Sequence, residues 1–352
     1  MALNDTLPAD NRLGFGAAPL GNMFRDIPDA EAHATVEAAW ARGIRYFDTA
    51  PSYGAGLAEA RLGDALAGRR RDDYFISTKV GRIVLDDLEE AATRDYGEKS
   101  GIFAHGRANR LVSDYSADAT LRSIEDSLKR LRTDRLDIVW VHDVAQDIYG
   151  DEWLAQFEVA RKGAFRVLGK LREEGVIGAW GLGVNRVEPI ELLLDLAEPQ
   201  PDGMLLAGRY TLLDHERALQ RVMPAAAARH VGIVVGGPYS SGVLVGGAHF
   251  EYRKAPPEVV AKVERINAIA ARHDVPVKAA ALQFVLAHPA TAAVIPGGRE
   301  PPGAHRGRCR GADVRDPRRF LARDARAAAR RGRCAAADRS LIRSAPPSPS
   351  GR

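Results

Sequence analysis

Four ionisable side chains of different kinds lie at or just after the ends of short apolar runs: Asp48, Tyr53, Lys79 and His142. The runs cover residues 44–47, 75–78 and 136–141, and their length and composition are typical of buried strands. Tyr53 follows Asp48 in a Pro-Ser-Tyr-Gly stretch, which predicts a turn. If the strands run parallel in a barrel, their carboxyl ends meet on one face. An acid, a phenol, an amine and an imidazole together on that face predict a proton-transfer site.

Tyr53 is the member of this set that we expect to exchange a proton with a substrate. The reference pKa of tyrosine is about 10, too high for ready proton exchange near neutrality, and a neighbouring cation lowers it by stabilising the phenolate. Lys79 is predicted to supply that cation, and Asp48 to hold Lys79 charged and in place. Tyr53 is then a general acid for carbonyl reduction or a general base for alcohol oxidation, while His142 orients the substrate oxygen.

Each of these four side chains taken alone also has a structural interpretation. Asp48 could be a cap or turn residue, Lys79 a strand end reaching solvent, Tyr53 a surface aromatic and His142 a histidine with satisfied hydrogen bonds. Metal chemistry is not indicated, because the His142-Asp143 pair has no second histidine at a ligand spacing. No serine lies in a nucleophile-elbow context. With a proton-transfer set but no metal or nucleophile, the chain is expected to use an organic hydride carrier.

Eight strand-like runs alternate with helical stretches, which predicts a parallel sheet built from strand–helix–strand units. The runs are residues 14–18, 44–47, 74–78, 136–141, 177–184, 204–206, 232–235 and 291–295, with helical periodicity over 119–131 and 164–174 among others. We therefore predict an α/β fold, a (β/α)8 TIM barrel. A doubly wound open sheet is the alternative, and it is disfavoured because Gly14-Phe15-Gly16 does not continue into a dinucleotide-binding glycine motif.

Residues 81–116 form a charged, glycine-containing stretch directly after the Lys79 run, and they predict a long irregular loop after the third strand. On the active-site face this loop would cover the substrate, with His105 and Tyr115 as weak candidates for substrate contacts. A solvated excursion with no role is the alternative.

The composition fits one enzyme-like domain with an unusual end. The chain has 352 residues, a usual size for such a barrel. Its polar first residues and the lack of a long apolar run predict a cytoplasmic protein without membrane association. The two cysteines, Cys309 and Cys334, support neither disulfides nor a metal site.

The charge of the chain is unevenly distributed. Residues 299–352 hold 15 Arg and 5 acids, a charge of +10. Because the net charge of the whole chain is +4, the remaining residues carry −6. We therefore expect no nucleic-acid partner.

The order of the four ionisable residues, with the phrases FDTAPSYGAGLAEARLG and LGFGAAPLGNMF, resembles the aldo-keto reductase family over about residues 13–299. The phrases are most similar to the branch that contains aldose 1-dehydrogenases and pyridoxal dehydrogenases. The resemblance implies that Asp48, Tyr53, Lys79 and His142 form the catalytic tetrad and that the cofactor is NAD or NADP. It implies a small carbonyl or sugar substrate, with oxidation of an anomeric hydroxyl to a lactone as the first choice. Pyridoxal oxidation, generic aldehyde reduction and a cofactor-binding partner subunit are the alternatives.

The same resemblance implies where the dinucleotide binds. Asn185 is expected to contact the nicotinamide carboxamide, although a helix N-cap is its ordinary alternative. Further contacts are expected from the pyrophosphate loop, Pro238, Tyr239, Ser240, Ser241 and Gly242, and from the adenosine turn, Pro296, Gly297 and Arg299. Two positions depart from the family: residues 206–210 lack the usual glutamine, and Gly236 stands where a tyrosine is common. Since Arg299 is the one cation identified for a 2′-phosphate, NAD is favoured.

The composition after Arg299 predicts a division into a barrel over residues 1–298 and a poorly packed or disordered tail over 299–352. Codons for residues 304–324 can be chosen so that a shifted reading frame encodes HIEEDVAALMCEIPAAFWRE, an acidic amphipathic helix. We therefore interpret the tail as a frameshift product that replaces the last helix with an irregular basic segment. A genuine disordered tail is the alternative, and resequencing the gene across codons 296–304 decides between them.

Overall fold

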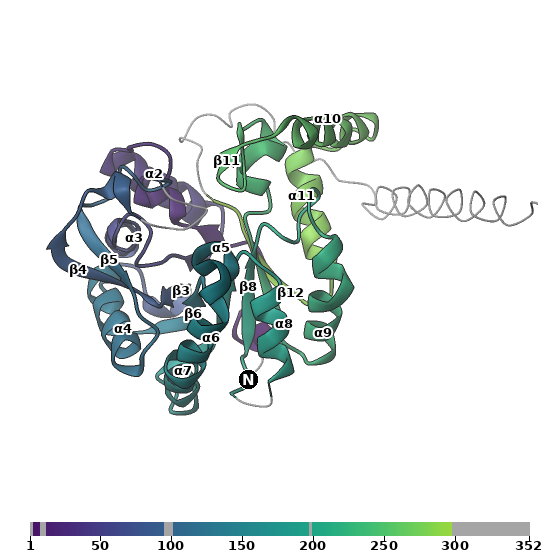
Figure 1. The fold of residues 1–352 in the computed structure, drawn as a ribbon. Helices are drawn as coiled ribbons and strands as arrows, with labels where there is room; N and C mark the ends of the chain where they lie inside the picture. Colours follow the sequence, from purple (N-terminus) through teal and green to yellow (C-terminus); the bar gives the residue numbers. More distant parts are fainter. Residues whose placement is uncertain (1–2, 8–11, 95–100, 197–198, 298–352) are drawn as a thin grey trace, which may run out of the picture.

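The computed structural model describes residues 3–7, 12–94, 101–196 and 199–297, and within them eight parallel strands form a nearly closed barrel (Figure 1). The strands, in their order around the sheet, are β1 (Phe15–Gly16), β2 (Tyr46–Asp48), β3 (Phe75–Val80), β6 (Leu136–His142), β7 (Ile177–Val184), β8 (Gly203–Ala207), β9 (Gly232–Gly236) and β12 (Thr291–Ile295). Parallel bridges from Leu13 to Val294 and from Gly16 to Gly297 connect the first and last strands. The predicted barrel is confirmed, and each of the eight predicted runs contains or overlaps one strand.

The strands are buried on both faces, which explains their almost continuous apolar sequences. Along β6, alternate side chains point to opposite faces: Ile138 and Trp140 into the barrel, Val139 and Val141 toward the helices. The barrel interior is filled by side chains from several strands together with two residues of the N-terminal segment, namely Leu3, Leu7, Tyr46, Ile138, Trp140, Ala179, Leu205, Val234 and Ala293. The barrel is therefore a packed core, and an open cavity can form only at its carboxyl end.

Helices surround the strands on the outside (Figure 1). They are α2 (Asp29–Ala41), α3 (Leu57–Leu66), α4 (Ala117–Leu131), α6 (Trp153–Lys162), α7 (Ala164–Glu173), α8 (Glu188–Asp195), α9 (Met223–Ala228), α10 (Pro257–Arg272) and α11 (Val277–Leu286), with the short α5 (Gln146–Tyr149). The short α1 (Leu3–Thr6) instead places Leu3 inside the barrel. The helix α4 shows how the sequence sets its ends. The hydroxyl of Ser116 accepts a hydrogen bond from Ala119 N at 3.3 Å, and Arg132 closes the helix in the left-handed conformation.

Residues 81–116 are more ordered than the sequence predicts, and the expectation of one long irregular loop is wrong in part. They contain an antiparallel pair, β4 (Arg82–Leu88) and β5 (Asn109–Ser113), with Ile83 opposite Val112 and Val84 opposite Leu111. This pairing satisfies backbone groups that an irregular loop would have left to water. Between the two strands, Ile102 and Phe103 are buried against other loops at the carboxyl end of the barrel.

Several shorter elements complete the carboxyl face and the connections: the 3-10 turns η1 (Ala18–Gly21), η2 (Arg71–Asp73), η3 (Ala91–Thr93), η5 (Gly150–Glu152) and η7 (Ser240–Val245), the π-turn η6 (Ala218–Val222), and the hairpin β10 (His249–Phe250) and β11 (Arg253–Lys254). The predicted tail, its boundary at residue 298 and the replaced last helix lie outside the described residues. In the part of the chain that the structure describes, no helix is long and apolar enough to cross a membrane. The same residues contain no cluster of three or more potential metal ligands.

Candidate active site

An ion pair between neighbouring strands is the centre of the candidate site. Lys79 Nζ lies 2.7 Å from Asp48 Oδ2 and also donates to the main-chain oxygen of Thr49 at 2.7 Å. Asp48 ends β2 and Lys79 lies near the end of β3, so the parallel pairing of the two strands brings them together. Both residues are almost completely buried, with exposures of 2% and 1%.

The other oxygen of Asp48 is also satisfied. Ser77 Oγ donates to Asp48 Oδ1 at 2.6 Å, and the hydroxyls of Ser77 and Tyr46 lie 2.9 Å apart. Burial raises the pKa of Tyr46 well above its ordinary value, and the negative charge of Asp48 adds to the effect. A buried carboxylate needs such partners on both oxygens, because an unpaired buried charge is costly. The network therefore holds Asp48 in one position.

Tyr53 lies in the turn between β2 and α3, as its sequence context predicts, and its ring faces Lys79. Lys79 Nζ is 4.6 Å from the ring centroid of Tyr53. The turn depends on a close approach of two glycines: a Cβ at Gly21 would lie 2.5 Å from the carbonyl carbon of Tyr53, and Gly54 has a φ of 64°. The ring of Phe103 stacks on Tyr53 at 5.6 Å between centroids. The Tyr53 ring is thus held between Lys79 and the loop that carries Phe103.

His142 ends β6 with each ring nitrogen near a polar side chain. Its Nδ1 lies 3.4 Å from Ser52 Oγ, and its Nε2 lies 3.5 Å from Asp143 Oδ2. The imidazole meets the ring of Tyr53 edge-on, with 5.8 Å between centroids. The structure therefore brings all four residues of the predicted tetrad together at the carboxyl end of the barrel.

Tyr115 is not placed to contact a substrate, which corrects the sequence-based expectation. It is 1% exposed, and its hydroxyl donates to the main-chain oxygen of His142 at 2.7 Å. The hydroxyl of Tyr149 donates to that of Tyr115 at 3.0 Å. Burial raises the pKa of Tyr115 well above its ordinary value. His105 is exposed and does not line the pocket described next. Tyr115 therefore fixes the main chain at His142 through its hydroxyl group.

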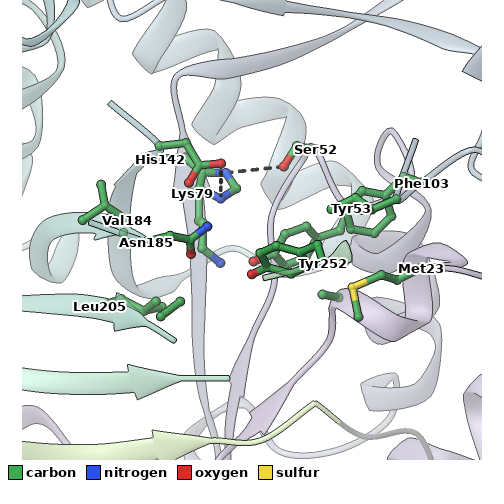
Figure 2. A pocket seen from close by; sticks show the side chains of 15 residues that line it. Met23, Ser52, Tyr53, Lys79, Phe103, His142, Val184, Asn185, Leu205 and Tyr252 are labelled. Atoms are coloured by element: carbon green, nitrogen blue, oxygen red, sulfur yellow. Dashed lines mark hydrogen bonds and ion pairs between the residues drawn. The ribbon is translucent and has the colours of Figure 1, made fainter. Parts of the chain in front are cut away.

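A pocket opens where these residues meet (Figure 2). In the figure, Met23, Tyr53, Phe103 and Tyr252 lie on one side, and His142, Val184, Asn185 and Leu205 on the other. Besides the predicted residues it is lined by Ala18, Met23, Ser52, Ile102, Phe103, Asp143, Gly183, Val184, Leu205, Ala207 and Tyr252. Met23, Phe103 and Tyr252 form one side of the pocket, which we call the aromatic wall after its two aromatic rings. Sequence reasoning missed all three, because they come from separate loops with no shared pattern. Asp143 could have been found, since it directly follows His142.

A second pocket continues from the first, and the two share Asn185, Ala207 and Tyr252. The second pocket also contains Ser240 and Ser241, as the resemblance implies for a dinucleotide. The helix α8 begins beyond Asn185, with Val187 at its N-cap position and no side-chain capping bond, so the capping alternative for Asn185 is wrong.

The loop after β9 is a tight turn that the resemblance assigns to the pyrophosphate. Ser240, Ser241 and Gly242 have φ values of 50°, 57° and 98°, and the N–H groups of Ser240 and Gly242 donate to the main-chain oxygens of Gly237 and Tyr239 at 2.9 and 3.0 Å. Pro238 is buried and Tyr239 half-buried at the start of η7. Arg209 also lines this second pocket. The Arg209 guanidinium and the hydroxyls of Ser240 and Ser241 are groups that fit the phosphates of a dinucleotide.

Arg209 is a further residue that the sequence did not single out. Its Nε donates to the main-chain oxygen of Asn185 at 2.9 Å, and its guanidinium pairs with Asp214 at 2.9 Å and with Glu251. It thereby joins the β8 loop to the β10–β11 hairpin beside Asn185. Gly236 stands where the family commonly has a tyrosine. A Cβ at this position would lie 3.1 Å from the Cβ of Ala207, so two small residues form the surface there.

The adenosine turn is described only in part. Pro296 and Gly297 lie at the seam of the barrel, where Gly16 N donates to the oxygen of Pro296 at 2.9 Å. Neither lines the two pockets described above. Arg299 lies outside the described residues, so its predicted contact with the cofactor stays a prediction.

Comparison with known proteins agrees with this geometry. The sequence profile described as "Aldo/keto reductase family" matches residues 12–305. Pyridoxal 4-dehydrogenase of Microbacterium luteolum is 38% identical over 300 residues, covering 82% of this chain and 86% of the relative. D-threo-aldose 1-dehydrogenase of a Pseudomonas species is 38% identical over 295 residues, covering 82% and 85%. The holo form of an aldo-keto reductase from Bacillus halodurans superposes with a TM-score of 0.60 at 26% identity, over 81% of each chain.

Proposed function

Because the chain belongs to the aldo/keto reductase family and is an oxidoreductase, we propose that it oxidises the anomeric hydroxyl of a small aldose to a lactone with NAD. The observation that carries this proposal is the buried cation beside the phenol: Lys79 Nζ is 2.7 Å from Asp48 and 4.6 Å from the Tyr53 ring centroid. A phenol beside a fixed ammonium can lose and regain its proton without a second base.

The roles of the side chains follow from their positions. Tyr53, as phenolate, accepts the proton of the anomeric hydroxyl, and Lys79 stabilises the phenolate. Asp48 keeps Lys79 charged and fixed, since both its oxygens are held. His142 forms a hydrogen bond to the reacting oxygen. When bound, NAD would supply the acceptor for the hydride that leaves the reacting carbon, so that the two electrons lost by the sugar are balanced. Asn185 and the Ser240–Gly242 turn are the residues that we assign to cofactor binding.

The pocket favours a substrate with one hydroxylated and one apolar edge. Asp143, Asn185 and His142 offer hydrogen-bond partners, whereas the aromatic wall offers apolar surface. A 6-deoxyaldose such as L-fucose combines both features, and so does the ring of pyridoxal. Pyridoxal oxidation is therefore the second candidate, favoured by the aromatic wall, and generic aldehyde reduction is the third.

A substrate panel followed at the nicotinamide absorbance tests the proposal. L-Fucose, other aldoses, pyridoxal and simple aldehydes are compared by kcat/KM with each dinucleotide. Turnover of aldoses with NAD, at higher kcat/KM than the others, is expected. Turnover of pyridoxal without turnover of any aldose would reverse the order of the first two candidates. Cofactor binding without turnover of any member of the panel would point instead to a partner subunit.

A further inference from the structure

Asp143 is a buried acid in the pocket that has no part in the proposed proton transfer. It is 7% exposed and lines the same pocket as His142, Tyr53 and Lys79. Consecutive residues of a strand point to opposite faces, so two neighbours reach one pocket only if the backbone leaves strand geometry between them. The chain does so at Asp143, whose φ of 55° lies in the left-handed region.

Main-chain hydrogen bonds hold Asp143 in this conformation. Its N–H donates to the oxygen of Gly183 on β7 at 2.9 Å, and its own carbonyl accepts from Ala145 N at 2.9 Å. Aspartate is one of the residues with a side chain that adopts the left-handed region most readily, and surrounding contacts fix such conformations at binding and catalytic sites. The backbone thus places the carboxylate of Asp143 beside His142 within the pocket.

The carboxylate is near the place where the reacting oxygen must lie. Asp143 Oδ2 is 3.5 Å from His142 Nε2. A carboxylate has about four acceptor positions, so it can accept from several donors at once. The ammonium group of Lys79 is committed to Asp48 at 2.7 Å.

We propose that Asp143 is a specificity-determining residue that accepts a hydrogen bond from a hydroxyl on the carbon next to the reacting carbon. This inference rests on the proposed function, which puts the reacting oxygen between Tyr53 and His142. A hydroxyl on the adjacent carbon then lies toward Asp143. The substrate class that it selects is the 2-hydroxyaldehydes and the aldoses, and a buried carboxylate at that position disfavours an anionic substituent there.

The alternative is that Asp143 acts only through His142, by holding its ring. The two roles differ in one measurable respect. A residue that orients His142 affects every substrate alike, whereas a residue that binds the neighbouring hydroxyl affects only substrates that carry it. The ratio of kcat/KM values for a hydroxylated substrate and its deoxy counterpart therefore isolates the proposed contact, as in a double-mutant cycle.

The experiment measures reduction of lactaldehyde and of propanal, which differ by that one hydroxyl, by the full chain with reduced nicotinamide cofactor. Asp143→Asn is the test variant, because asparagine tolerates a left-handed φ and removes the charge. Asp143→Gly is a second variant that adopts the same φ freely. Asp151→Asn is the matched control, since Asp151 is an exposed acid in the same connection after β6.

The wild type is expected to prefer lactaldehyde, and the ratio is expected to fall about 10-fold or more in both Asp143 variants but not in the control. An unchanged ratio, with both kcat/KM values lowered together, would overturn the proposal, and so would a wild type without preference. Failure of the proposed function has a different signature: the wild type would not oxidise aldoses, while its preference for lactaldehyde over propanal would still be measurable.

Discussion

The hydroxyl of Tyr115 donates a 2.7 Å hydrogen bond to the main-chain oxygen of His142, and this bond ties the segment before α4 to the end of β6. The contact is out of reach of a substrate, yet it fixes the backbone from which the imidazole projects. It also links the site to the buried hydroxyl pair of Tyr115 and Tyr149. We therefore expect substitutions of Tyr115 to change turnover although it lies outside the pocket.

Tyr115→Phe tests that role. Loss of both hydrogen bonds of the Tyr115 hydroxyl is expected to lower the free energy of unfolding by about 1–3 kcal/mol. It is also expected to lower kcat more than it raises KM, because the imidazole is less well oriented. Denaturant unfolding and steady-state kinetics measure the two effects. Tyr210→Phe is a matched control, since Tyr210 is equally buried and lines neither pocket. Unchanged kcat in Tyr115→Phe would assign the residue a purely structural role.

Tyr53→Phe removes only the phenolic oxygen. Turnover is expected to fall by roughly 10²–10⁴, the usual contribution of general acid–base catalysis, while the dissociation constant of the cofactor stays nearly the same. Rapid kinetics gives the first quantity and fluorescence titration with the dinucleotide gives the second. Turnover like that of the wild type would remove Tyr53 from the proposed role.

Lys79→Met leaves Asp48 as a buried charge without its cation. Removing one partner of a buried ion pair typically costs about 3–5 kcal/mol, and a loss in this range is expected in the free energy of unfolding, together with loss of turnover. The double variant Lys79→Met/Asp48→Asn removes both charges and should recover part of the stability without recovering activity. Equal stability of the single and double variants would contradict the view that the unpaired carboxylate is what destabilises the fold.

Alkaline pH is expected to destabilise the folded chain through its buried tyrosines. Burial raises the pKa of Tyr46 and Tyr115 well above the ordinary value and raises the pKa of Tyr210 to about 12. In the unfolded chain these groups lose their protons near pH 10. Between about pH 10 and the folded-state pKa the unfolded state therefore binds fewer protons, and the free energy of unfolding falls as pH rises.

Guanidinium unfolding at pH 8 to 11 measures this slope. Tyr210→Phe should make it shallower with little cost at pH 8, since the ring contact of Tyr210 with Phe284, at 5.3 Å between centroids, is retained. A slope in Tyr210→Phe identical to that of the wild type would show that Tyr210 titrates normally in the folded state.

Cofactor choice gives a further prediction. We predict from the sequence that Arg299 is the cation that would face a 2′-phosphate, and residues 1–298 carry a net charge of −6. The Michaelis constant for NAD is therefore expected to lie below that for NADP. Arg299→Ala should leave the constant for NAD nearly unchanged. A markedly lower constant for NADP in the wild type would reverse the assignment.

The site residues that could be predicted best from the sequence are those at the carboxyl ends of neighbouring strands. Asp48, Lys79 and His142 follow apolar runs, and in a parallel barrel such positions converge without any knowledge of the loops. The aromatic wall was missed because Met23, Phe103 and Tyr252 meet only after three loops have packed together. The β4–β5 pair was missed because charged residues lie at the end of β4 and the start of β5, and residues 89–108 separate the two strands.

The close contact between Gly21 and Gly54 indicates which positions of the site tolerate substitution and which do not. Their main chains touch beneath Tyr53, where a methyl group at Gly21 would strike the carbonyl carbon of Tyr53. A library that aims at new substrates should therefore leave both codons fixed and randomise Met23 and Tyr252, whose loops carry side chains into the pocket without contributing to the barrel. Selectivity can then be evolved while the reactive centre stays the same.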